Sequence, residues 1–351
     1  MSTLGARASR VLFTDRAGNR IGDLTSRQVS QGKWARVTSD VSDASSTFTA
    51  EPGTAMADLE PWLHHVTTYR GDDIVWRGVV YSTAVAGNQV TVTARDPAVY
   101  FDRRRIGQER RWVQEDLSTI AATVIRDAMA IDDPFNILGT MVVEPTGTYI
   151  TRSVKLDERM VAEELKDLTE AGLVWTVHGG RVLIGPVAKA HTTAAISDQD
   201  VDARMTITKN GSATMTDARI LGKNATGVFS DYASPIGVLQ TIEKKDALTS
   251  EADCTDAARA IVKARSITPR RISLPGDSRL LATAPVDVNE LIVGAQVPVR
   301  TRYTGVLVNQ DMTIDEVSGV FGPGKDEISV TLVEPEPDLT PDELAAPFTG
   351  Y

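Results

Sequence analysis

The sequence repeats one pattern of strands, near its start and again near its end. In the first copy, residues 62–69 alternate apolar and polar positions, a longer run follows over 74–84, and a turn over 86–89 leads into a closing strand over 90–95. Alternation with a period of two places one set of side chains on a buried face and the other in water. Turns that contain Gly and Asn reverse the chain between such strands. This copy is therefore predicted to be a three-stranded antiparallel meander.

The second copy has the same order of strands. It consists of a short strand with Val297 and Val299, a long strand over 307–317, a Gly-containing turn over 321–326 and a closing strand with Ile328, Val330 and Leu332. A true internal repeat would predict two similar β domains. The alternative is that antiparallel proteins contain such meanders generally, because the identity between the copies is too low to demonstrate duplication. The sequence leaves both interpretations open.

Between the meanders the apolar spacing changes to three and four residues, which predicts helices. One amphipathic helix is expected over 116–130. A second is expected between an N-cap at Asp157 and a left-handed Gly172, followed by a hairpin that turns at 178–180. A third helix is expected to begin near Ser250, inside the second β-rich region. The middle of the chain is thus predicted to be a small α+β domain.

Charge is unevenly distributed along the chain. With 37 basic and 47 acidic residues the net charge is −10, which repels a phosphate backbone and disfavours general nucleic-acid binding. A basic cluster nevertheless follows the first meander. Its alternatives are a solvated loop or salt bridges to acidic neighbours. We predict contacts with another subunit at Arg103, Arg104, Arg105, Arg110 and Arg111.

Three segments resemble ligand-binding motifs, but none of them meets the requirements of its motif. Residues 319–326 approach the phosphate-loop pattern, but Asp326 replaces the magnesium-binding hydroxyl and strands flank the segment on both sides, so a hairpin turn is expected. The tripeptide Arg70-Gly71-Asp72 is also interpreted as a turn. His64 and His65 are adjacent in a predicted strand and point to opposite faces, so they do not suit one metal ion.

Catalytic signatures are missing as well. The sequence has no nucleophile elbow, no metalloprotease helix and no dinucleotide loop. Glu163, Glu164, Asp167 and Glu170 are interpreted as the solvated face of a helix rather than as a hydrolase pair. The single Cys254 cannot form an intrachain disulfide. We therefore expect a structural or binding protein, with no enzyme activity, no cofactor and no metal site.

The chain shows no sign of membrane insertion or secretion. No apolar run approaches the roughly 20 residues that span a bilayer, and the first residues lack the charged and apolar blocks of a signal peptide. Synthesis in the cytoplasm is expected. The end of the chain, 334–351, combines four prolines with acidic residues, a composition that cannot bury a core, so it is expected to be an extended arm.

Several stretches of the chain form loose patterns that can be compared with known families. They are Leu59-Glu-Pro-Trp62, Ile74-Val-Trp-Arg-Gly-Val79, Asn88-Gln-Val-Thr-Val-Thr-Ala-Arg-Asp96, Tyr100-Phe-Asp-Arg-Arg104, Gly172-Leu-Val-Trp175 and Val293-Gly-Ala-Gln-Val297. Together these stretches resemble siphophage tail-tip hub proteins, which are minor tail proteins related to the baseplate hubs of contractile phages. The resemblance covers most of the chain.

This resemblance implies a mainly β fold with an α+β insertion, in which two related β-barrel domains flank the small α+β domain. The expected boundaries are 1–105 for the first barrel, 106–200 for the middle domain, 201–333 for the second barrel with one helix, and 334–351 for the Pro-rich acidic arm. It also implies a homotrimer whose six barrels adapt the six-fold tail tube to a three-fold tip.

The resemblance further implies partners and a location. The expected partners are the distal tail protein ring, the tape-measure protein and other minor tail proteins or fibres, with phage DNA passing transiently through the centre. The protein would thus be synthesised in the cytoplasm of the bacterial host and belong to the virion, at the tail tip. Two other functions remain open: a distal tail protein that forms a hexameric ring, and a tail-associated cell-wall hydrolase, which the missing catalytic motifs disfavour.

Overall fold

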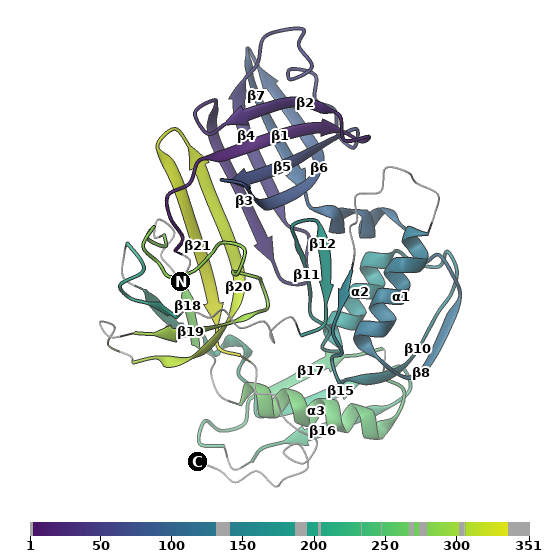
Figure 1. The fold of residues 1–351 in the computed structure, drawn as a ribbon. Helices are drawn as coiled ribbons and strands as arrows, with labels where there is room; N and C mark the ends of the chain where they lie inside the picture. The colour runs from purple at the N-terminus through teal and green to yellow at the C-terminus, as the bar shows by residue number, and fades with distance from the viewer. Residues whose placement is uncertain are drawn as a thin grey trace.

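The structure is a computed structural model (Figure 1). It describes residues 3–130, 141–186, 195–202, 205–232, 234–246, 248–266, 270–273, 279–301, 305 and 307–335. Apart from its first two residues, the predicted arm over 334–351 lies outside this part. The described chain is mainly β with an α+β insertion, which confirms the expected fold class.

The first barrel consists of seven antiparallel strands. They are β1 (Ser9–Asp15), β2 (Arg20–Thr25), β3 (Val29–Val37), β4 (Asp43–Thr49), β5 (His64–Arg70), β6 (Asp73–Ala86) and β7 (Gln89–Arg95), in the spatial order β3-β4-β7-β6-β5-β1-β2. The strand predicted over 62–69 begins only at His64. Trp62 has a left-handed backbone (φ 66°), which an extended strand does not accommodate.

The second barrel continues the same sheet. Its strands are β13 (Ile196–Ser197), β14 (Thr206–Lys209), β18 (Arg270–Ser273), β19 (Gln296–Arg300), β20 (Asn309–Gly322) and β21 (Lys325–Val333). Residues Glu316–Phe321 of β20 pair with β3, so the two barrels form one sheet of thirteen strands. Figure 1 shows β20 and β21 lying beside the first barrel.

Both predicted meanders are present in this sheet. The strands β5, β6 and β7 pair in sequence, and so do β19, β20 and β21. The long central strand has 14 residues in each copy. In each copy its register against the closing strand shifts once, between Val80 and Ser82 in β6 and between Ile314 and Glu316 in β20. Common ancestry of the two copies stays a prediction.

Two glycines allow the barrels to join closely. Gly319 of β20 lies opposite Trp34 of β3, and Gly32 of β3 lies opposite Phe321 of β20. A Cβ atom added to either glycine would overlap the facing aromatic ring. The rings therefore lie over bare backbone at the seam between the barrels, an arrangement in which an aromatic side chain covers a strand glycine.

The two barrels share one hydrophobic core. A single cluster of buried side chains includes Val11 and Phe13 of the first barrel together with Met312 and Val317 of the second. Because domains with separate cores can move or unfold separately, a shared core makes the two barrels one cooperative body.

The predicted α+β domain forms beside this body and has its own core. Its elements are the 3-10 helix η1 (Pro97–Arg103), β8 (Arg110–Asp116), α1 (Leu117–Met129), β9 (Val142–Val143), β10 (Tyr149–Val154), α2 (Val161–Glu170), β11 (Trp175–His178) and β12 (Arg181–Ile184). The prediction that Asp157 caps α2 is wrong. Asp157 lies in the preceding turn (φ 58°), and the amide of the N-cap Met160 donates to Glu163 Oε2 at 2.8 Å.

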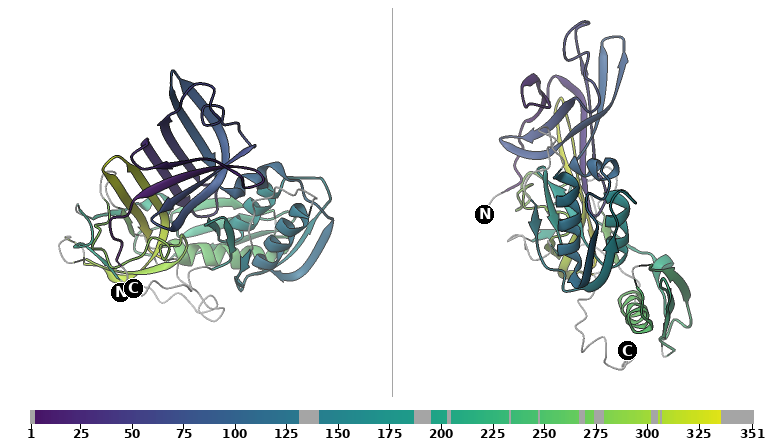
Figure 2. Two further views of the ribbon diagram at one scale, coloured as in Figure 1. Left: turned by 45° about the horizontal axis from the view of Figure 1, so that its top comes forward. Right: turned by 90° about the vertical axis from the view of Figure 1, so that its right-hand side faces the viewer.

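A further small unit lies at the opposite end of the molecule from the β6–β7 hairpin (Figure 2). It contains the 3-10 helix η3 (Gly211–Ala213), the sheet β16-β15-β17, with β15 (Asp217–Leu221), β16 (Thr226–Ser230) and β17 (Gln240–Lys244), and α3 (Glu251–Arg265). As predicted, Ser250 caps α3, and its hydroxyl accepts from the amide of Asp253 at 3.1 Å. The helix packs on this small sheet in a core of its own.

The glycine seam generates a first prediction. Substituting Gly319→Val would force Trp34 out of its place and should lower the free energy of unfolding by about 1–3 kcal/mol. Urea denaturation followed by tryptophan fluorescence measures this change. The matched control is Ser318→Val, whose side chain lies on the other face of β20 and whose effect should stay within about 0.5 kcal/mol. Equal effects of the two substitutions would contradict the seam model.

Candidate functional site

The two turns at 70–72 and 321–326, whose sequences resemble functional motifs, lie next to each other at the junction of the barrels. The guanidinium of Arg70, at the end of β5, donates to both carboxylate oxygens of Asp326, in the second position of β21, at 2.8 Å each. Arg70 is only 2% exposed, so the tripeptide at 70–72 cannot present its arginine to a partner. Asp326 forms this ion pair with Arg70, and it is not part of a phosphate-binding loop. Both motifs are hairpin ends, as the sequence predicts.

The N-terminal segment binds across the same junction. The carbonyl of Leu4 accepts from Arg70 Nη1 at 2.8 Å, while the amide of Leu4 donates to Ala284 in the second barrel at 2.9 Å. The amide of Arg7 donates to Asp326 at 3.0 Å, and its guanidinium pairs with Asp73 at the start of β6. Residues 4–7 therefore hold the two barrels against each other.

A second buried arginine ties the α+β domain to both barrels. Arg36 of β3 donates from Nη1 to Nδ1 of His178 at 2.7 Å and from Nη2 to the carbonyl of Val288 at 3.0 Å. Its guanidinium also stacks over Trp34, 5.0 Å from the ring centre. Burial lowers the pKa of Arg36 to about 9. One side chain thus contacts three parts of the fold. The sequence signal of this role is that Arg36 occupies an inward-facing position of β3, two residues after the buried Trp34, where an apolar residue would be expected.

His178 is held neutral by these surroundings. Burial, with the nearby charges of Arg36 and Arg181, lowers its pKa to about 3. Because Nδ1 accepts the hydrogen bond from Arg36, the ring proton lies on Nε2. The hairpin of β11 and β12 therefore depends on an uncharged imidazole.

Asp96 is another buried ionisable group, at the start of η1. It accepts from the amide of Ser42 at 3.0 Å, from the hydroxyl of Ser42, and from the amide of Ala98 at 2.9 Å. Burial raises the pKa of Asp96 to about 7 despite these hydrogen bonds. This carboxyl fastens η1 to the loop before β4.

The arginines predicted as subunit contacts engage different partners. Arg110 forms two hydrogen bonds to Asp127 at 2.8 and 3.0 Å, and Arg105 pairs with Asp157 at 3.4 Å. Arg103 lies over the ring of Trp62, 5.6 Å from its centre. For Arg105 and Arg110, these contacts agree with the alternative that the cluster forms salt bridges to acidic neighbours within the chain.

The remaining two arginines differ in exposure. Arg104 is half-buried, and its carbonyl accepts from the amide of Val161 at the start of α2. Arg111 is exposed on β8, as are Arg103 and Arg105 on the segment before it. The most exposed of the five are therefore Arg103, Arg105 and Arg111, and their role as contacts with another subunit stays a prediction.

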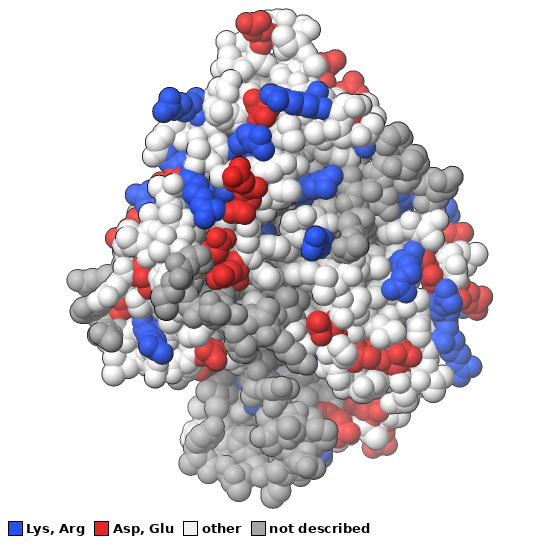
Figure 3. All heavy atoms as spheres, in the orientation of Figure 1, with Lys and Arg blue, Asp and Glu red and all other residues white. Residues whose placement is uncertain are grey.

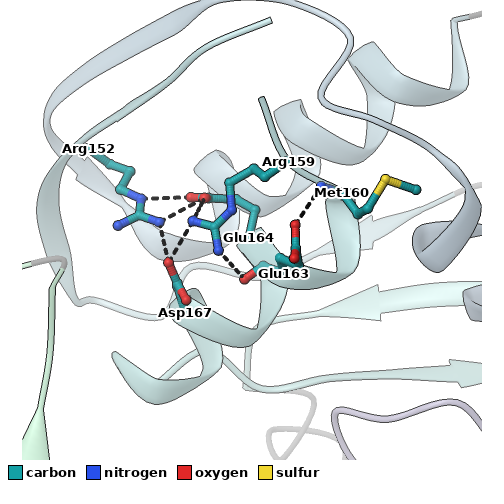
Figure 4. Close-up of polar contacts among 6 residues, drawn as sticks. All are labelled: Arg152, Arg159, Met160, Glu163, Glu164 and Asp167. Carbon is teal, nitrogen blue, oxygen red and sulfur yellow. Dashed lines mark hydrogen bonds and ion pairs between the residues drawn. The ribbon is translucent and has the colours of Figure 1, made fainter. Parts of the chain in front are cut away.

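Two of the four acids on helix α2, Glu164 and Asp167, belong to a four-residue ion cluster, while Glu163 and Glu170 are exposed (Figure 4). Arg152 bonds Glu164 at 2.7 and 2.8 Å and Asp167 at 2.6 Å. Arg159 bonds the same two carboxylates at 3.0 and 2.7 Å, and Glu164 is fully buried. The prediction that these acids are solvated is therefore wrong for Glu164.

This cluster is poorly suited to acid–base catalysis. Burial alone would raise the pKa of Asp167, but the hydrogen bonds and charges of Arg159 and Arg152 outweigh it and lower the pKa. A general acid needs a raised pKa and access to a substrate. The paired carboxylates thus fasten α2 to β10 and to the turn before α2.

Among the described residues no group of three His, Cys, Asp or Glu side chains could hold a metal ion. None of the helices in the described ranges is long and apolar enough to cross a membrane. Figure 3 shows cations and anions interspersed over the visible face, which does not form a broad basic surface for nucleic acid.

The barrel junction generates a second prediction. Because Arg70 is buried, Asp326→Asn should lower the free energy of unfolding by about 3 kcal/mol. A double-mutant cycle with Arg70→Met should give a coupling energy above about 2 kcal/mol in urea denaturation. The control cycle uses Arg10 and Asp23, a more exposed pair at 3.4 Å, where the coupling should stay below about 1 kcal/mol. Similar couplings in both cycles would contradict a special role for the junction.

The neutral imidazole generates a third prediction. Between its folded pKa of about 3 and its ordinary value near 6.5, the unfolded chain binds a proton at His178 that the folded chain does not. The stability that His178 contributes is therefore present above pH 6.5 and is lost as the pH falls. From pH 7 to pH 5 this loss should amount to about 1–2 kcal/mol.

His178→Asn tests this sign, because an Asn carbonyl can accept from Arg36 but cannot take up the proton. The variant should lose less unfolding free energy than the wild type between pH 7 and pH 5, as measured by urea denaturation at each pH. Asp96, with its raised pKa, changes stability in the opposite direction, but it is common to both proteins and cancels in the comparison. Parallel pH profiles would rule the prediction out.

The sequence matches no protein-family model, and no curated protein matches it either. Solved structures do match. The 43 kDa tail protein of prophage MuSo2 from Shewanella oneidensis has a TM-score of 0.63 at 14% identity, covering 93% of this chain and 98% of the other. A tail protein from Neisseria meningitidis has a TM-score of 0.63 at 11% identity, covering 93% and 96%.

A third match is the prophage tail protein gp18 from Listeria monocytogenes. It has a TM-score of 0.56 at 10% identity and covers 95% of this chain and 97% of the other. Identities this low show the fold alone. Because each match covers nearly the whole of both chains, the barrels, the α+β domain and the small unit together have the fold of phage tail proteins.

Proposed function

We propose that this chain is a structural component of a phage tail tip: a homotrimeric hub that adapts the six-fold tail tube to a three-fold tip and forms part of the DNA conduit. The observation that carries the proposal is the likeness to phage tail proteins over more than nine tenths of the chain. It is proposed to act without catalysis and without a cofactor, as a part of the virion.

The joined barrels favour a hub over a hexameric distal ring. A chain with two similar barrels needs only three copies to present six. Such an adaptor needs a constant angle between its barrels, since the angle sets the spacing of all six. Three features of this chain hold that angle: the pairing of β3 with β20, the buried pair of Arg70 and Asp326, and the shared core.

The proposed partners follow from this position. The distal tail protein ring would lie above the hub, the tape-measure protein inside it, and other minor tail proteins or fibres below. Phage DNA would pass through without specific binding. A net charge of −10 suits such a conduit, because an acidic lining does not retain phosphates. A channel lined mainly by Arg and Lys would contradict this part of the proposal.

Mass photometry of the purified protein gives the fourth prediction. A hub should form particles of three chain masses, and a distal ring particles of six. The triple variant Arg103→Glu, Arg105→Glu and Arg111→Glu should weaken the trimer at least tenfold, because it reverses three exposed charges at the predicted contact.

A matched control changes three other exposed cations to Glu, namely Arg20, Lys209 and Lys223, and should leave the trimer intact. Equal weakening by both triple variants would remove the assignment of the contact while keeping the trimer. A protein that stays monomeric at every concentration, or a lytic band from the purified protein in zymography on host cell walls, would contradict the proposed function.

A further inference from the structure

The small sheet β16-β15-β17 is covered on one face only. Helix α3 packs on that face, where Ala218 and Ile220 of β15 meet Cys254, Ala258 and Val262 of the helix. Figure 2 shows α3 on one side of this sheet and no helix on the other. A sheet of three short strands leaves its second face open unless another segment covers it.

The open face carries large apolar side chains. Arg219 in the centre of β15 pairs with Val228 of β16 on one side and with Ile242 of β17 on the other, so the three form one row. All three are exposed, Ile242 to 66%. In contrast to this row, its neighbours Ala218 and Ile220 point to the helix and are buried.

The connection between β16 and β17 adds further exposed apolar residues next to the sheet. It crosses the end of β15, where the amide of Thr216 donates to the carbonyl of Leu239 at 3.0 Å. Six of the fifteen large apolar residues that are exposed in the described part lie between 228 and 242. They are Val228, Tyr232, Ile236, Val238, Leu239 and Ile242. Such a concentration is typical of a binding surface.

Charge on this surface is positive. Arg219 occupies its centre, and Lys244 is exposed at the end of β17. Two acidic side chains of the sheet are engaged inside the unit: Glu243 pairs with Arg265 at 3.3 Å, and Asp217 accepts from the hydroxyl of Ser230 at 2.5 Å. The surface therefore suits a segment that combines apolar side chains with negative charge.

The chain itself contains such a segment, residues 336–351. It lies outside the described part of the structure, and only its sequence matters here. It has no Lys or Arg, and it interleaves acids with apolar residues and prolines. The acids are Glu336, Asp338, Asp342 and Glu343, the large apolar residues are Leu339, Leu344, Phe348 and Tyr351, and the prolines are Pro337, Pro341 and Pro347.

This segment begins close to the small unit. The carbonyl of Arg265, at the end of α3, accepts from the amide of Met215 just before β15, at 3.1 Å. Arg271 pairs with Val333 at the end of β21. Six residues from Arg265 to Arg271 span at most about 20 Å, and the sixteen residues of the segment can span about 50 Å. The segment can therefore reach the open face within the same chain.

We propose that the open face of the β16-β15-β17 sheet binds the acidic C-terminal segment 336–351 of the same chain. The prolines, which donate no backbone hydrogen bond, disfavour addition of the segment as an edge strand. They favour an extended segment that lies across an exposed apolar surface such as that of Val228 and Ile242. The proposal is independent of the tail-tip function, because it concerns contacts within one chain.

Engineered cysteines in the full chain test the proposal. Ile242→Cys is combined in turn with Leu339→Cys, Leu344→Cys and Phe348→Cys, and each protein is oxidised mildly. The native Cys254 does not compete, because it is buried and burial raises the pKa of its thiol. At least one pair should form an intrachain disulfide, seen on a non-reducing gel and by peptide mass spectrometry.

The control places the first cysteine at Val85 on β6 of the first barrel, which is 56% exposed where Ile242 is 66% exposed. Its disulfide yield with the same three partners should be about tenfold lower, because the segment is not concentrated there. Adding Arg219→Glu to the best pair should reduce the yield several-fold at low salt and much less in about 1 M salt. Circular dichroism verifies that each variant is folded.

Three results would overturn the proposal. The first is equal yields at positions 242 and 85. The second is no intrachain disulfide with any of the three partners. The third is covalent dimers instead of intrachain links, which would place the segment of one copy on the open face of another.

Discussion

The pairing of β3 with β20 is the contact on which the rest of the molecule depends. It turns two barrels into one sheet, and it places Arg36 where three parts of the fold converge. A buried guanidinium is costly when its donors lack partners, and the Nε of Arg36 already has none in the described structure, so the bonds from Nη1 to His178 and from Nη2 to Val288 are needed to keep Arg36 buried. The packing of β3 against β20 and the hydrogen bonds of the buried Arg36 therefore depend on each other.

The sequence predicts local structure well in this chain and long-range structure poorly. Alternation identifies β6 and the apolar spacing identifies α1, because both patterns arise from side chains burying one face of a single element. The same alternation does not indicate which strands pair with each other in the sheet. Nothing in residues 29–37 specifies a partner almost 300 residues away, and the complementary glycines Gly32 and Gly319 are recognisable only once the two strands are paired.

At the polar sites, too, the sequence predicts the local structure but not the long-range contacts. The turns at 70–72 and 321–326 are predictable from their glycines, but the ion pair that joins Arg70 to Asp326 needs the folded junction. The start of α2 was predicted at the wrong residue because Met160 is not a usual N-cap type, and Glu163 supplies the compensating hydrogen bond. Glu164 is buried among arginines that come from β10 and from the turn before the helix, which helical spacing alone cannot indicate.

The contact between Arg7 and Asp326 joins residues 319 positions apart, which has a consequence for biosynthesis. A ribosome releases the first barrel with the β3 edge unpaired, long before β20 is made. Unpaired strand edges are sites of wrong association. The exposed Lys33 on that strand gives the nascent edge a positive charge, which opposes self-association until β20 is made and completes the sheet.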